Sequence, residues 1–157
     1  MSDDEELLEQ QLVEDIASFT HDPHGYALYA FPWGEEGTEL HDSAGPRQWQ
    51  GEAFDEIGGH LQNPATRHQP LLICRASGHG IGKSAWISML VKWGMDTCED
   101  CKVVVTANTE NQLRTKTWPE IAKWQRLSIT SDWFNCTATA IYANDPAHAK
   151  SWRADAV

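Results

Sequence analysis

A glycine-rich stretch that ends in lysine and serine is the part of this sequence best suited to chemistry. Its glycines let successive backbone N–H groups curve around a phosphate without Cβ clashes, and a helix that starts directly after them adds its positive end. Lys83 then reaches the β- and γ-phosphates of a nucleotide, and the Ser84 hydroxyl can hold Mg²⁺. The pattern predicts a phosphate-binding loop, or Walker A motif, for ATP and Mg²⁺, with Lys83 as its catalytic residue. The loop consists of Ser77, Gly78, His79, Gly80, Ile81, Gly82, Lys83 and Ser84.

The loop departs from the usual pattern at its first position, where Ser77 replaces a glycine. Gly78 and Gly80 add flexibility, so the backbone can still close around a phosphate. The alternative is a glycine-rich turn that happens to end in Lys-Ser. The flanking sequence favours the binding loop, because the motif requires a strand before it and a helix after it. An apolar run at 71–74 and a helix-like run at 85–93 meet that requirement.

The elements that must position this loop alternate between helix and strand. We expect helices over 3–19 and 47–61, a strand at 70–75, a helix from the loop to about Met95, a buried strand at 102–107, a helix after Asn108, and strands within 131–142. This order predicts an α/β fold, the P-loop NTPase three-layer sandwich with a mostly parallel sheet.

Charge and composition exclude several classes of protein. The chain has 157 residues and a net charge of −11, and seven of its 23 acidic residues lie within positions 1–15, which hold no basic residue. An acidic start is unlike a secretion signal or transit peptide, and no apolar run approaches the roughly 20 residues of a membrane span. A basic stripe for nucleic acid is absent as well. We therefore expect a cytoplasmic protein without membrane contact.

The cysteines offer half of a zinc site at most. Cys98 and Cys101 have the spacing of one ligand pair, but no second pair follows at such a spacing. Cys136 and His148 could complete the set only if the tertiary structure brought them near. We expect reduced thiols in a turn between helix and strand, with zinc as the alternative.

Separated blocks of sequence together resemble a known family. They resemble the N-terminal part of the ATPase domain of large terminase subunits, the DNA-packaging motors of tailed bacteriophages, and they cover nearly the whole chain. The blocks are Phe31–Gly34, Pro46–Gln50, Ser77–Ser84 and Val103–Glu120. The resemblance implies an N-terminal helical and loop extension at 1–45 and a partial P-loop ATPase domain at 46–157.

The same resemblance implies roles for individual residues. Gln50 would read the adenine edge and Trp49 would offer a stacking surface, although Trp49 fits equally well as a core residue of its helix. Arg114, in a helicase-like motif after the second strand, would lie near the DNA path or couple DNA to the nucleotide; Arg114 and Lys116 fit equally well as surface charges. His79 occupies the position of an arginine finger, and imidazole is mostly neutral at pH 7. Arg75 is the other candidate.

The residues that complete ATP hydrolysis in this family are not found in the sequence. Phosphoryl transfer to water needs an acid that holds Mg²⁺ and a residue that positions the attacking water. Asp55-Glu56 precedes the loop, and Asn144-Asp145 lacks a glutamate. The nuclease domain is missing too. We therefore expect a P-loop domain that is incomplete at its C-terminus.

Three functions remain open. The first is the ATP-binding portion of a terminase large subunit, which in the full-length protein would move viral DNA with the small terminase subunit and the portal, either as a single chain or as a homo-oligomer. The second is a truncated prophage remnant that binds nucleotide without catalysis. The third is an unrelated small P-loop nucleotide-binding protein, which would leave the block at 46–50 unexplained.

Overall fold

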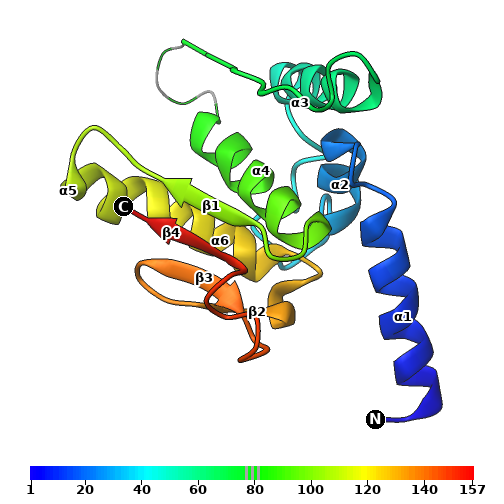
Figure 1. The fold of residues 1–157 in the computed structure, drawn as a ribbon. Coiled ribbons are helices and arrows are strands. Elements are labelled where there is room, and N and C mark those ends of the chain that lie inside the picture. The colour runs from blue at the N-terminus through cyan, green and yellow to red at the C-terminus, as the bar shows by residue number, and fades with distance from the viewer. Residues whose placement is uncertain (77, 79, 81) are drawn as a thin grey trace.

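The computed structural model describes residues 1–76, 78, 80 and 82–157 (Figure 1). Its helices are α1 (Asp3–Ala17), α2 (Pro23–Ala30), α3 (Gln48–Gln62), α4 (Lys83–Thr97), the short α5 (Glu110–Gln112) and α6 (Trp118–Leu127), with a π-helical turn at Leu113–Thr117 and a 3₁₀ turn at Ser131–Trp133. Its strands are β1 (Lys102–Val105), β2 (Phe134–Cys136), β3 (Ala140–Ala143) and β4 (Arg153–Ala156).

Local sequence explains where the first helices begin. Ser2 and Glu5 form a capping box at the start of α1, each side chain bonding the other residue's backbone N–H. Asp22 caps α2 by accepting from the N–H of Gly25, and Pro23 occupies the first helical position. The cap and the proline therefore set the start of α2, which ends before the extended Phe31.

The strands form one small mixed sheet in the order β1-β4-β3-β2. β1 and β4 are parallel, whereas β4 with β3 and β3 with β2 are antiparallel. β2 and β3 are joined by a tight turn in which the Thr137 N–H donates to the Ala140 carbonyl over 2.8 Å. A connection this short can only join antiparallel strands.

The predicted P-loop sandwich with a mostly parallel sheet is wrong. Residues 70–75, which we expected to form the strand before the loop, lie wholly within the described part of the chain and belong to no strand. Leu72 in this segment is 90% exposed. An apolar run shows that a segment can pair but not that a partner strand is beside it. The prediction failed because it inferred pairing from residue type alone.

The sheet has one buried face and one open face, which is also why the expected three layers are absent from the described elements. Paired residues such as Val103 with Ala154, and Ala154 with Ile141, point to the face that packs on α4 and α6. The opposite face carries Val104, 69% exposed, and Arg153, whose guanidinium bonds Asp155. The described sheet and helices thus form two layers.

A second core joins the N-terminal helices to α4. Tyr26 and Ala27 of α2 and Phe54 of α3 are fully buried, together with Met89 of α4 and residues of α6. Helix α1 extends away from this core in Figure 1, and Ile16 in its last turn is its one buried residue. The segment predicted as an N-terminal extension therefore contributes side chains to the same core as α3 and α4.

The described helices were compared with what a membrane span requires, about 20 apolar residues in a row. None of them is both long enough and apolar enough to cross a bilayer.

Candidate functional site

The predicted phosphate-binding loop leads directly into α4. Gly80 and Gly82 have φ angles of 79° and 86°, in the left-handed region that side chains other than glycine rarely adopt. Gly82 is the N-cap of α4, and Lys83 is its first helical residue. A Cβ added at Gly78 or Gly80 would meet no described atom within 4 Å, so open space borders these glycines. Ser77, His79 and Ile81, also predicted for this site, lie outside the described residues.

Two side chains from α3 and its N-cap hold the carbonyl groups of this loop. Arg47 Nη1 donates to the Gly80 carbonyl over 3.0 Å, and Gln50 Nε2 donates to the Gly82 carbonyl over 2.8 Å. Gln50 is itself fixed, because its Oε1 accepts from the Arg47 N–H over 2.8 Å. In a trans peptide the N–H points opposite to the C=O. Holding the Gly82 carbonyl thus directs the Lys83 amide away from Gln50.

The two residues predicted to contact adenine are largely engaged within the protein. Gln50 is only 4% exposed, and both atoms of its amide group are bonded. Trp49 is half-buried and packs on Trp86, with 6.1 Å between the ring centroids. The packing of Trp49 matches the alternative of a core residue. Adenine recognition by Gln50 stays a prediction, and it requires the amide to leave these bonds.

Lys83 and Ser84 occupy the first turn of α4. Lys83 is half-buried and Ser84 is exposed. The Ser84 carbonyl accepts a hydrogen bond from Ser88 Oγ over 2.6 Å, while Gly82 contributes no side-chain cap. The first turn of any helix presents backbone N–H groups without intrahelical partners. The chemistry here is that of an anion site with a lysine and a hydroxyl at its border.

The other residues considered for catalysis are held by different partners. Arg75 pairs with Glu56, and Asp55 pairs with His24 over 3.0 Å. Asp145 caps a turn by accepting from the Ala147 N–H. Arg75 and each of these candidate acids therefore contact neighbouring residues other than those of the phosphate-binding loop.

Arg114 and Lys116, predicted to lie near a DNA path, are exposed. Arg114 forms an ion pair of 2.8 Å with Glu110 one turn earlier. A cavity of about 330 Å³ lies where β1 and β4 end. Its lining includes this ion pair and also Thr109, Thr139 and Val157. The carboxyl ends of parallel strands are a common place for ligands in α/β proteins. Sequence reasoning missed this cavity because it depends on the pairing of β4 with β1.

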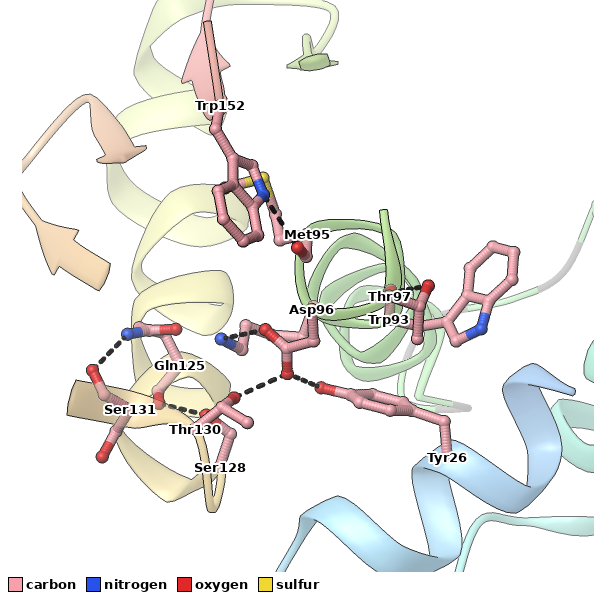
Figure 2. Close-up of polar contacts among 11 residues, drawn as sticks. Tyr26, Trp93, Met95, Asp96, Thr97, Gln125, Ser128, Thr130, Ser131 and Trp152 are labelled. Atoms are coloured by element: carbon pink, nitrogen blue, oxygen red, sulfur yellow. Dashed lines mark hydrogen bonds and ion pairs between the residues drawn. The ribbon is translucent and has the colours of Figure 1, made fainter. Parts of the chain in front are cut away.

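The other end of α4 holds a buried polar network (Figure 2). Lys92 and Asp96 are both fully buried at the side-chain level and form an ion pair of 3.0 Å. Asp96 Oδ2 also accepts from Tyr26 Oη over 2.5 Å and from Thr130 Oγ1 over 2.6 Å. The Lys92 ammonium lies 4.6 Å from the centroid of the Phe134 ring. The only sequence signal for this network is a lysine and an aspartate placed four residues apart in a largely apolar helix.

Burial changes the protonation of this network. Desolvation, reinforced by the charge of Asp96, raises the pKa of Tyr26 well above 10.0. Desolvation lowers the pKa of Lys92, and the neighbouring Asp96 carboxylate opposes that shift. The network joins α2, α4 and the turn after α6, so its role is structural.

A third polar cluster lies where α4 turns into β1. Cys98 to Cys101 form a turn closed by the Cys101 N–H and the Cys98 carbonyl at 3.1 Å. His148, from the loop between β3 and β4, places Nδ1 2.8 Å from Asp100 Oδ1 and Nε2 3.7 Å from Glu99 Oε1. The tertiary structure thus brings His148 to the turn that carries the two cysteines.

Comparisons with known proteins give no relative. Neither protein-family models, curated proteins nor solved structures produced a match to this chain.

Proposed function

We propose that this chain is the ATP-binding portion of a DNA-packaging terminase large subunit, with the loop before α4 as its triphosphate site. The observation that carries the proposal is the pair of left-handed glycines, Gly80 and Gly82, directly before a helix that begins with Lys83-Ser84. The proposal rests on this local geometry together with the blocks of terminase-like sequence. Residues 70–75 form no strand, so the strand that usually precedes such a loop lends the proposal no support.

The described residues fit a triphosphate in three ways. The open space beside Gly78 and Gly80 leaves room for phosphate oxygens near the backbone. Helix α4 runs for 15 residues, so its N-terminus carries the partial positive charge of a full macrodipole. The Arg47 guanidinium, bonded to Gly80, adds a formal positive charge beside the loop.

Each group then has a defined task. The loop amides bind the phosphate oxygens, and the Lys83 ammonium neutralises charge on the β- and γ-phosphates. The Ser84 hydroxyl is a ligand for Mg²⁺, which supplies further neutralisation of the phosphates when bound. Gln50 and Arg47 keep the loop carbonyls turned toward α3.

The proposal covers binding and leaves hydrolysis to the full-length motor. There, ATP would drive viral DNA into a procapsid in the host cytoplasm, with the small terminase subunit and the portal as partners. For this chain we expect Mg²⁺-ATP binding with negligible phosphate release.

Isothermal titration with Mg²⁺-ATP tests the proposal on three proteins: the wild-type chain, Lys83→Ala, and Lys150→Ala as the matched control. Lys150 is exposed on the loop between β3 and β4. We expect saturable binding that is lost in Lys83→Ala and kept in Lys150→Ala. A folded wild-type chain that binds no nucleotide, or equal binding by all three proteins, would contradict the proposal.

A further inference from the structure

The turn between α4 and β1 and the loop between β3 and β4 bring together an arrangement suited to a transition metal. We propose that Glu99 and His148 bind a Zn²⁺ ion, with Asp100 as the residue that orients His148. This site is separate from the proposed nucleotide site, since it lies beyond the opposite end of α4. Glu99, Asp100 and His148 offer ligand atoms that all lie within 4.8 Å of one another.

The distance between the two direct ligands is suited to an ion. His148 Nε2 and Glu99 Oε1 are 3.7 Å apart, which is too far for a hydrogen bond. Two ligands bound to tetrahedral Zn²⁺ at their usual bond lengths lie about 3.4 Å from each other. A small rotation of the exposed Glu99 side chain is enough to reach that geometry.

The imidazole is already held in the required orientation. Its Nδ1 lies 2.8 Å from Asp100 Oδ1, an atom that also accepts from Ser151 Oγ over 2.7 Å. The ring meets Trp152 edge-on, with 6.3 Å between centroids. A carboxylate that holds one imidazole nitrogen while the other binds the metal is the usual second-shell arrangement of zinc sites. With Nδ1 protonated and held by Asp100, Nε2 is left as the donor to the ion.

The charge around the histidine favours a cation. Asp100, Asp145 and Glu99 all act on His148 electrostatically, and each is an acid. One imidazole nitrogen with carboxylate oxygens suits Zn²⁺ better than Ca²⁺ or Mg²⁺, which prefer oxygen ligands only. Water completes the coordination, since these side chains are partly exposed.

The two cysteines of the same turn are the competing ligands. The set of atoms within 4.8 Å includes neither sulfur. The nitrogen and oxygen set is therefore the one that the described geometry supports.

The consequence would be a metal link between Glu99 and His148, which lie 49 positions apart in the sequence. The loop between β3 and β4 would be fastened to the end of α4, one turn beyond Asp96 and the buried network. Binding of Zn²⁺ to the folded state alone would raise the stability of the chain.

The experiment titrates the full chain, without nucleotide, first with Zn²⁺ by calorimetry and then with Co²⁺ as a spectroscopic probe. The variants are Glu99→Gln, His148→Gln, Asp100→Asn and the double variant Cys98→Ser/Cys101→Ser. His41→Gln is the matched control, since His41 is exposed and bonds only the Thr38 carbonyl. Omitting nucleotide keeps this result independent of ATP binding.

We expect one Zn²⁺ per wild-type chain, binding abolished in Glu99→Gln and His148→Gln, and affinity about 10- to 100-fold weaker in Asp100→Asn. The cysteine double variant and His41→Gln should bind as the wild type does, and the Co²⁺ spectrum should lack a thiolate charge-transfer band. No saturable binding by the wild type would overturn the proposal. Loss of binding in the cysteine variant, with a thiolate band in the wild type, would overturn it too.

Discussion

The two ends of α4 are built in opposite ways. At its N-terminal end, left-handed glycines and two bonds from the α3 region position an exposed turn that carries Lys83. At its C-terminal end, Lys92 is fully buried and its charge is balanced by Asp96, whose oxygens are bonded to two further side chains. Lys83 is half-buried beside the glycine loop, whereas Lys92 is fully buried and paired with Asp96.

The difference separates function from stability within one helix. A buried charge with a complete set of partners cannot bind a ligand without breaking the fold. A partly exposed helix start can bind an anion at little structural cost. Changes at the two ends should therefore affect different measurements.

The largest effect is expected at the buried end. Asp96→Ala leaves the Lys92 ammonium without its counter-ion and the hydroxyls of Tyr26 and Thr130 without their acceptor. We expect the free energy of unfolding in urea to fall by about 3–5 kcal/mol. The double variant Lys92→Met/Asp96→Leu, which removes both charges, should lose much less. Equal losses in the two variants would contradict a role for the unpaired charge.

Gly82→Ala tests the N-terminal end and should cost less stability. Its φ of 86° is strained for alanine by about 1–2 kcal/mol, and the new Cβ would lie 2.7 Å from Gln50 Nε2. We expect weaker Mg²⁺-ATP binding by calorimetry as the loop shifts. Gly59→Ala is the control, because Gly59 lies within α3 with no atom near its Cβ position and should gain about 0.5–1 kcal/mol. If Gly82→Ala binds Mg²⁺-ATP as tightly as the wild type, Gly82 does not shape the binding loop.

Much of α3 and α4 could be predicted from the sequence, because apolar residues at helical spacing and the loop before Lys83 mark these helices. The absence of a strand at 70–75 could not be predicted, since strand pairing depends on a partner far along the chain. The reverse holds for β4, whose Arg-Ala-Asp-Ala sequence has little strand propensity and becomes a strand by pairing with β1 and β3.

The buried network at Asp96 and the cluster at His148 could not be predicted from the sequence either. Asp96 and Tyr26 are 70 positions apart, and Asp100 and His148 are 48 apart. No spacing rule joins residues at such separations, so only the tertiary fold reveals them. The glycine loop was recognisable because all of its residues are consecutive.

Gln50→Glu should have a smaller effect, confined to the N-terminal end. It keeps the acceptor for the Arg47 N–H but replaces the donor to the Gly82 carbonyl with an oxygen. Loss of one hydrogen bond costs about 0.5–1.5 kcal/mol, and we expect Mg²⁺-ATP to bind several-fold more weakly. An affinity that stays at the wild-type value would show that the bond to Gly82 does not position the loop.

The smallest expected effect is a pH dependence at the buried end. Because the pKa of Tyr26 is raised above 10.0 in the folded state, the unfolded chain releases this proton first as the pH rises. The contribution of Tyr26 to stability is thus complete below pH 10.0 and is lost above it. Urea unfolding from pH 8 to 11 should show a steeper loss for the wild type than for Tyr26→Phe. The same dependence of unfolding free energy on pH in both proteins would contradict a raised pKa for Tyr26 in the folded state.

The most direct test of the central claim follows the backbone amides of α4 by ¹H–¹⁵N NMR during titration with Mg²⁺-ATP. Gly82, Lys83 and Ser84 lie at the proposed site, whereas Asp96 and Thr97 lie at the opposite end of the same helix. We predict saturable shifts at Gly82, Lys83 and Ser84, with Asp96 and Thr97 unmoved. Shifts centred on Asp96 and Thr97, or no shift at Lys83 and Ser84 at saturating nucleotide, would contradict the account.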